Sequence, residues 1–244
     1  MPSELFSDFL KERAHIGDGA NAKVYAWRGF AYKCFRDGYD KNWLAHERRV
    51  QAVIEAAGLP AAKYYDSEFE NTIKMELIDG VSLADRMRKQ RYKGWLNDML
   101  ELFNDIHTRE NLPLSPLKPA LKASVMRANI DNTLIDAAIS YIDDIPDANT
   151  LCHLDYHFLN IMYADGRYRV IDWVNAKIGN PIFDFARTYV IMNEFAYRLS
   201  GVFLRAAKAR FAEDDLRKAV FVMAADRLAE FDKPQTRKLL DTYA

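Results

Sequence analysis

The sequence is poor in cysteine and has no excess of charge of either sign. Only Cys34 and Cys152 occur among 244 residues, both in apolar runs, where a free thiol usually acts as a small hydrophobic side chain. They indicate neither a disulfide framework nor a zinc site. The net charge is -1 and the basic residues are scattered, so we expect no nucleic-acid partner.

The sequence also lacks a long apolar run. No stretch reaches the roughly 18 apolar residues of a membrane span, and residues 1–13 carry acids but no signal-peptide core. We therefore expect a soluble, cytoplasmic protein with no membrane partner, either a monomer or a weak dimer. Half of the residues are hydrophobic and 28% are charged, the composition of an ordinary globular chain.

The residues most useful for chemistry lie in the stretch 151–187. His153, Asp155 and Asn160 share one short segment, and Asp172 closes the strand-like run RYRVID after a turn-like Ala-Asp-Gly. An acid followed five residues later by an amide, with a second acid at the end of a nearby strand, suits oxygen ligation of Mg2+ beside a hydroxyl that must lose its proton. The pattern predicts phosphoryl transfer.

A glycine-containing segment near the N-terminus predicts a nucleotide-binding hairpin. Residues 17–22 formally fit the dinucleotide fingerprint, but that motif must open a helix, whereas a strand-like run follows here. The P-loop pattern fails because no Ser or Thr follows Lys23. The protein-kinase glycine hairpin remains, with Val24 in place and Ala22 where a third glycine would stand. A plain glycine-containing β-turn is the alternative.

Two charged residues occupy positions where apolar ones are expected. Lys33 interrupts the apolar strand FAYKCF, and Glu47 shares one face of a predicted helix, about 40–57, with Trp43, Val50 and Ile54. A buried charge is costly unless it is paired, so the sequence predicts a Lys33–Glu47 pair; in kinases such a pair holds the α- and β-phosphates. The alternatives are an exposed edge-strand lysine and a solvated glutamate.

The pattern changes from strands to helices after Ile78. Gly80 and Ser82 mark the break, and helices are predicted at 83–90 and 93–107. We expect a small β-rich lobe at 1–78 and a mostly helical lobe at 79–244. Three prolines within 111–123 predict an irregular connection before a helix at about 124–142.

The order of these features resembles the aminoglycoside phosphotransferase and choline kinase-like family. The motifs HLDYHFLNIM, VIDW and GNPIFDFAR carry the resemblance, supported by the glycine hairpin, Lys33, Glu47 and the hinge-like KMELIDG. It implies a bilobal, protein-kinase-like α+β fold, with a small antiparallel sheet and one main helix in the N-lobe and a mostly helical C-lobe. It also implies a small-molecule kinase that uses ATP and Mg2+.

The resemblance implies a role for each matching residue. Asp155 would be the catalytic aspartate, Asp184 would brace its loop, and Asn160 and Asp172 would bind Mg2+. The glycine hairpin would cover the phosphates of the nucleotide with Gly17, Gly19 and Ala22, and Lys33, fixed by Glu47, would hold the α- and β-phosphates. Backbone groups of the hinge, from Glu76 to Ile78, would contact the adenine. Three positions depart from the usual patterns: Leu154 replaces glycine, Ala22 replaces glycine, and Trp173 replaces phenylalanine.

Other functions remain open at this point. A protein kinase would have a long activation segment ending in Ala-Pro-Glu, whereas only WVNAKIGNPIF separates Asp172 from Asp184; a small acceptor is favoured. His153, Asp155 and His157 alternate and predict, as a second alternative, a metal-dependent hydrolase, although His153 alone suits a buried, loop-bracing role. A nucleotide-binding pseudokinase is the third. Aminoglycosides, amino-sugars, choline, thiamine and nucleosides are all candidate acceptors.

Overall fold

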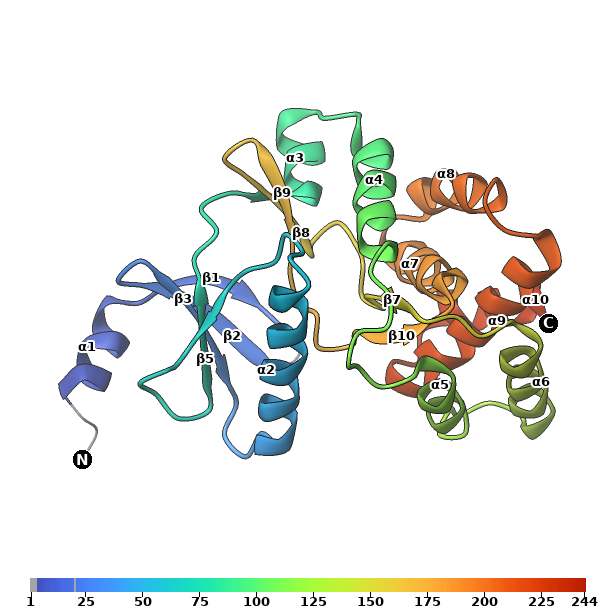
Figure 1. Cartoon of the computed structure of the whole chain (residues 1–244), viewed down its shortest axis with the longest axis horizontal. Coiled ribbons are helices and arrows are strands. Elements are labelled where there is room, and N and C mark those ends of the chain that lie inside the picture. The colour runs from blue at the N-terminus through green and yellow to red at the C-terminus, as the bar shows by residue number, and fades with distance from the viewer. Residues whose placement is uncertain (1–3, 20) are drawn as a thin grey trace. The chain divides into compact units, whose positions relative to one another are not determined.

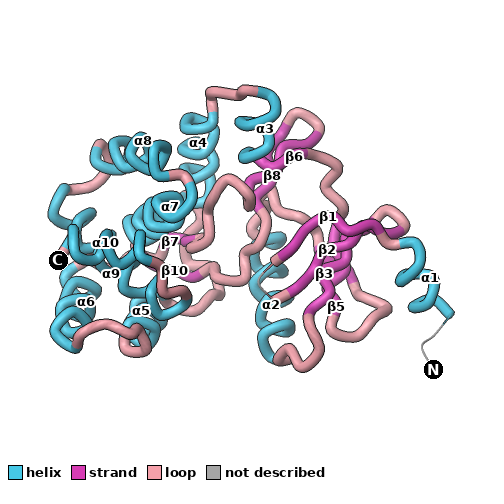
Figure 2. The backbone as a smooth tube through the Cα atoms, turned by 180° about the vertical axis from the view of Figure 1, so that it is seen from behind, coloured by secondary structure: helices cyan, strands magenta, loops and turns pink. Residues whose placement is uncertain are grey.

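The computed structural model describes residues 4–19 and 21–244. The chain forms two compact units (Figure 1), of which the first contains Met1–Lys89 and Ile161–Val174 and the second contains Gln90–Asn160 and Asn175–Ala244. Most of the strands lie in the first unit, where helices accompany them, and the second unit is mostly helical, as the tube drawing shows (Figure 2). Within the described residues, no helix has the length and apolar character needed to span a membrane.

The first unit is built on a five-stranded antiparallel sheet. Its strands are β1 (Ala14–Asp18), β2 (Ala22–Trp27), β3 (Phe30–Phe35), β4 (Tyr64–Tyr65) and β5 (Thr72–Glu76), in the order β1-β2-β3-β5-β4. The predicted glycine hairpin thus lies between two strands, β1 and β2, and β3 follows after a turn. Arg28 and Gly29 make the turn between β2 and β3 with φ of 45° and 80°, the sign required by a tight hairpin whose twist matches its strands.

Alternation along β3 sends its side chains to two different cores. Tyr32 packs with Trp27, Phe69 and Phe9, the last from helix α1 (Glu4–Glu12). Phe35 belongs to the cluster of the opposite face, which also includes Ala22 and Ile73. Because side chains alternate along a strand, Lys33 lies on the same face as Phe35, the face toward helix α2 (Lys41–Ala56).

A later part of the chain completes the first unit. Strand β6 (Val81–Ser82) pairs with β8 (Ile161–Ala164), which forms a hairpin with β9 (Arg167–Val170). The Val170 N–H donates to the Pro60 carbonyl at 2.8 Å, which ties the hairpin to the segment before β4. Helix α3 (Leu83–Gln90) follows β6, and Ser82 Oγ accepts from the Asp85 N–H at 3.1 Å, which caps the N-terminus of the helix.

The second unit consists of helices around a short two-stranded sheet. Helix α7 is buried on nearly every side from Ile182 to Asn193 and contacts α8, α9 and α10 (Figure 1). Most of these buried side chains are apolar, as expected of a helix in a core. The elements of this unit are α4 (Trp95–His107), α5 (Leu117–Val125), α6 (Asn132–Asp144), β7 (Thr150–Cys152), β10 (Lys177–Gly179), α7 (Pro181–Phe195), α8 (Tyr197–Lys208), α9 (Glu213–Glu230) and α10 (Pro234–Tyr243).

One sequence expectation is wrong in this unit. Helix α5 begins at Leu117, inside the stretch predicted to be irregular, and α6 begins at Asn132, so two helices replace the predicted one. Pro119 is the third residue of α5. The first four N–H groups of a helix have no intrahelical acceptor, so a proline there removes no helical hydrogen bond.

Buried ion pairs join α7, α9 and the start of α10. Arg187 Nη1 lies 2.8 Å from Asp226 Oδ2. The Glu194 side chain is 2% exposed, and its carboxylate forms ion pairs with Arg227 Nε at 2.8 Å and Lys233 Nζ at 2.5 Å. Burial raises the pKa of Glu194, but the hydrogen bonds from Arg227 and Lys233 outweigh burial and lower this pKa to about 2.

We expect Glu194→Gln to lower the free energy of unfolding at pH 7 by about 2 kcal/mol, because a depressed pKa favours the folded state. An unfolded glutamate has a pKa of about 4.3, so this contribution is present above that pH and is lost as the pH falls toward about 2. The difference in free energy of unfolding between wild type and variant, measured with urea, should be smaller at pH 3 than at pH 7. An energy difference that is the same at both pH values would contradict this prediction. The control is Glu213→Gln, which alters an exposed ion pair with Lys208.

Candidate active site

The predicted charged pair forms within the first unit. Lys33 Nζ lies 2.8 Å from Glu47 Oε1 and 3.2 Å from Asp172 Oδ1. The Glu47 side chain is 2% exposed and that of Lys33 is 15% exposed, so the alternatives of a solvated glutamate and an exposed lysine are wrong. Strand β3, helix α2 and the segment after β9 thus bring together three of the predicted site residues.

The two carboxylates keep Lys33 charged. Burial alone lowers the pKa of Lys33, but the negative charges of Asp172 and Glu47 and their hydrogen bonds outweigh burial, so its pKa is raised. A permanently protonated ammonium is a fixed point charge, the form in which lysine binds phosphate.

The segment after β9 holds Asp172 in an unusual backbone conformation. Asp172 has φ of 64°, a left-handed value that is sparsely populated by residues other than glycine and clusters at functional sites. Trp173 is buried and its Nε1 donates to the Val170 carbonyl at 2.9 Å. His46 Nε2 lies 3.1 Å from the Val174 carbonyl oxygen. The tryptophan that departs from the protein-kinase pattern therefore anchors the segment that carries Asp172.

The predicted glycine loop joins β1 to β2. Gly17 lies at a bulge in the β1–β2 pairing, and the Gly19 N–H donates to the Ala22 carbonyl at 2.8 Å. Ala22, which replaces a loop glycine, is buried with Phe35 and Ile73, so its methyl group fills the core of the unit. Ala20, within the predicted loop 17–22, lies outside the described residues.

The predicted hinge begins at the end of β5. Glu76 is the last residue of β5, and its N–H donates to the Lys63 carbonyl at 2.8 Å. Its carboxylate forms an ion pair with Arg169 of β9. Ile78, two residues later, is half-buried. Glu76 thus connects the start of the hinge to Lys63, the residue before β4, through a backbone hydrogen bond, and to the β8–β9 hairpin through an ion pair.

Asp155 and Asn160 lie together in the second unit. Asn160 Nδ2 donates to the Asp155 carbonyl at 2.8 Å and to Asp155 Oδ2 at 3.0 Å. These two acceptors orient the Asn160 amide, so that its nitrogen faces Asp155 and its oxygen points elsewhere. The Asp155 side chain is 23% exposed, accessible enough to meet a substrate.

The same loop contradicts the three-residue metal site. His153 is fully buried, and its Nδ1 accepts from the Asp155 N–H at 3.1 Å, so it braces the loop. Across residues 4–19 and 21–244, no group of three or more His, Cys, Asp or Glu side chains is arranged to hold a metal ion. His153, Asp155 and His157 therefore do not form the transition-metal site of a hydrolase.

Asp184, in the first turn of α7, binds the backbone of this loop. Its two carboxylate oxygens accept from the N–H groups of His153 at 2.8 Å and Leu154 at 2.7 Å. His107 Nε2 lies 3.1 Å from the same carboxylate. Leu154 has φ of 62° and is 7% exposed, so the residue that replaces the family's usual glycine sits where glycine is conformationally favoured.

Because of this backbone conformation, we expect glycine at position 154 to give a more stable protein than alanine, the reverse of their usual order in stability. Leu154→Ala and Leu154→Gly both remove a buried side chain and should lower the free energy of unfolding by about 1 to 3 kcal/mol, more than the relieved strain restores. The glycine variant should be the more stable by about 1 kcal/mol, because alanine keeps the cost of a left-handed backbone. Urea unfolding measures both values.

The control for this comparison is Leu121, a 3% exposed residue inside helix α5. There alanine should be more stable than glycine by about 1 kcal/mol, the ordinary helical preference. The same order at position 154 would contradict the prediction.

Two contacts of the site were not foreseen from the sequence. Tyr64 Oη donates to Glu47 Oε1 at 2.9 Å, and His107 contacts Asp184. Both are long-range contacts, and a tyrosine in a strand or a histidine at a helix end carries no local pattern that reveals such a partner.

Comparison with known proteins identifies the chain's family. The model of the phosphotransferase enzyme family matches residues 14–220. The chain belongs to this family. The family match confirms the predicted class of enzyme, a small-molecule phosphotransferase. A comparison with curated protein sequences gave no match.

Solved structures confirm the predicted protein-kinase-like fold of this phosphotransferase. Choline kinase LicA from Streptococcus pneumoniae is 14% identical over 98% of this chain and 95% of its own, with a TM-score of 0.69. An aminoglycoside phosphotransferase APH(4)-Ia mutant, in ternary complex with ADP and hygromycin B, is 16% identical over 98% and 96%, with a TM-score of 0.71. A choline/ethanolamine kinase family protein from Mesorhizobium loti is 15% identical over 99% and 88%, with a TM-score of 0.62.

Proposed function

We propose that this phosphotransferase transfers the γ-phosphoryl group of ATP to a hydroxyl group of a small molecule. The observation that carries the proposal is the position of Lys33, 2.8 Å from Glu47 and 3.2 Å from Asp172. A lysine held between a helix glutamate and a second acid is the arrangement that kinases use to bind the α- and β-phosphates. Structures of related fold contain ADP or AMP.

The glycine loop between β1 and β2 is a second observation that supports the proposal of a bound nucleotide. Neither Gly17 nor Gly19 has a left-handed backbone, and a Cβ at either position would make only ordinary contacts. The fold of the chain therefore does not require glycine there. A loop that leaves space above its backbone suits close approach by phosphate oxygens. In this role residues 17–22 cover the phosphates, and backbone groups of Glu76 and Ile78 meet the adenine.

The chemistry of the donor groups fits Mg2+. The Asn160 nitrogen is used by Asp155, which leaves its carbonyl oxygen for a cation, and Asp172 uses Oδ1 for Lys33. Oxygen ligands of this kind are the ones that Mg2+ prefers. Asn160 and Asp172 would hold the ion, which supplies positive charge to the phosphate oxygens.

Asp155 is the proposed base. It would orient the acceptor hydroxyl and accept its proton as the oxygen–phosphorus bond forms and the bond to ADP breaks. Asn160 keeps the carboxylate in one orientation. The protein's contribution is positioning and charge neutralisation rather than covalent chemistry.

A small acceptor is favoured over a protein. Between Asp172 and Asp184 the chain forms a short strand, β10, and then enters α7 at Pro181. This leaves no length for the activation and docking segment of a protein kinase. The acceptor would be an aminoglycoside-like compound, an amino-sugar, choline or a comparable hydroxyl compound.

The test is a screen for ATP consumption by the purified chain. Aminoglycosides, amino-sugars, choline, thiamine and nucleosides are supplied singly with ATP and Mg2+, and mass spectrometry identifies the phosphorylated product. We expect turnover with at least one small molecule and its loss when EDTA removes the metal. ATP binding without turnover would favour a pseudokinase, and phosphorylation of proteins alone would favour a protein kinase.

A further inference from the structure

Helix α2 is fastened to the segment before β5 by three polar side chains on one face. Glu47, Gln51 and Glu55 are spaced by four residues, so they align along the helix. Glu47 Oε1 accepts from Tyr64 Oη at 2.9 Å, Gln51 Nε2 donates to the Ala62 carbonyl at 2.6 Å, and Glu55 Oε1 accepts from the Tyr64 N–H at 2.9 Å. Tyr64 alone makes two of these three contacts.

The contact with Glu47 lies at the centre of the proposed nucleotide site. The same oxygen, Glu47 Oε1, accepts from Lys33 Nζ at 2.8 Å and from Tyr64 Oη at 2.9 Å. The Glu47 side chain is 2% exposed, so water cannot replace a donor that is lost. A buried carboxylate with one donor fewer is destabilised. The hydroxyl of Tyr64 therefore helps to hold the Glu47 carboxylate in place.

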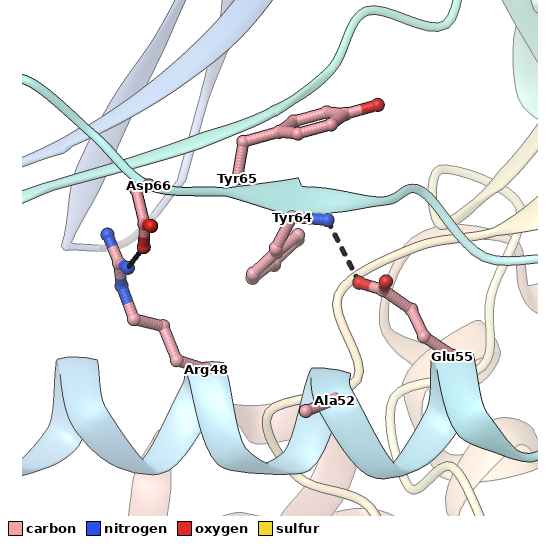
Figure 3. A pocket seen from close by; sticks show the side chains of 6 residues that line it. All are labelled: Arg48, Ala52, Glu55, Tyr64, Tyr65 and Asp66. Atoms are coloured by element: carbon pink, nitrogen blue, oxygen red, sulfur yellow. Dashed lines mark hydrogen bonds and ion pairs between the residues drawn. The ribbon is translucent and has the colours of Figure 1, made fainter.

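Tyr64 remains a donor over the whole physiological range. Burial, followed by the negative charge of Glu47, raises the pKa of Tyr64 well above its usual value. Both Tyr64 and Tyr65 line a pocket of about 430 Å³. The ring of Tyr64 points from β4 toward α2, whereas the ring of Tyr65 points to the other side of the strand (Figure 3). Of the two neighbouring tyrosines, Tyr64 is therefore the one whose ring is directed toward α2, the helix that carries Glu47.

We propose that Tyr64 is a positioning residue for nucleotide binding, which rests on the function proposed above. Its hydroxyl fixes Glu47, and Glu47 in turn fixes Lys33. Lys33 has a second partner in Asp172, whose side chain is 37% exposed. When Glu47 is loosened, the ammonium group is free to move toward Asp172 and away from the position that meets the phosphates. Tyr64 itself touches neither the phosphates nor the acceptor in this scheme.

The test compares Tyr64→Phe with Tyr65→Phe in the full chain. Each change removes one hydroxyl, from adjacent residues of the same strand. Tyr64→Phe should weaken ATP binding about 5- to 30-fold, measured at equilibrium, as expected for a hydrogen bond to a charged group. The KM for ATP should rise with it while the KM for the acceptor stays constant. Tyr65→Phe should match the wild type in all three values.

A double-mutant cycle shows whether Tyr64 acts through Glu47. In a Glu47→Gln background the loss caused by Tyr64→Phe should fall below about twofold. A purely structural tyrosine would lower thermal stability without changing ATP affinity, and would have the same effect in both backgrounds; either result overturns the inference. If wild type binds ATP and Tyr64→Phe binds it equally well, this inference alone fails. If wild type binds no ATP, the proposed function fails as well.

Discussion

Asp155→Asn should lower the turnover number by a factor of about 10² to 10⁴ while leaving the dissociation constant for ATP within about threefold of the wild-type value. Asparagine has the size of aspartate, and its side-chain oxygen can still accept from Asn160 Nδ2, now 3.0 Å from Asp155 Oδ2. The change therefore removes the proton acceptor and little else. Steady-state kinetics and equilibrium ATP binding measure the two quantities.

A matched control is Asp165→Asn, which changes an exposed acid in the turn of the β8–β9 hairpin. Its turnover should equal that of wild type. Two results would count against Asp155 as the base: turnover retained in Asp155→Asn, or ATP binding lost together with turnover. The second would mean that the residue supports nucleotide binding or the fold instead.

The charged pair shows what a sequence pattern can reveal. Lys33 and Glu47 were predictable because each places a charge where the periodicity of its element requires an apolar side chain, and a buried charge needs a partner. Trp43 was assigned to the same helix face by the same periodicity, yet it is 55% exposed. It lies in the first turn of α2, one turn before the buried positions begin, and periodicity does not show where a neighbouring surface ends.

The second partner of Glu47 shows where sequence reasoning stops. The hydroxyl of Tyr64 reaches Glu47 because β4 pairs with β5, Tyr64 opposite Met75, and so faces α2. This register depends on tertiary packing. The left-handed backbone of Leu154 is similarly invisible, because leucine gives no local signal for it. Motifs identified the residue types of the site and the bracing role of Asp184, whereas the contacts of Tyr64 with Glu47 and of His107 with Asp184 required coordinates.

Asp184→Asn should lower the free energy of unfolding by about 3 to 5 kcal/mol, the largest stability loss that we expect from a single substitution here. The Asp184 side chain is fully buried, and its carboxylate accepts from the N–H groups of His153 and Leu154 and contacts His107 Nε2. Asparagine offers one acceptor oxygen in place of two and turns an NH2 group toward groups that themselves donate. At least one buried backbone N–H is then left without a partner.

The same substitution should lower turnover, because Asp155 follows the two residues that Asp184 holds. Urea unfolding at pH 7 measures the stability, with Asp143→Asn as the control. Asp143 pairs with Lys122 at 2.6 Å but is 59% exposed, and loss of a surface ion pair costs at most about 1 kcal/mol. An Asp184→Asn variant within 1 kcal/mol of wild type would mean that the loop keeps its conformation without this carboxylate. The strained backbone of Leu154 would then need another source of support.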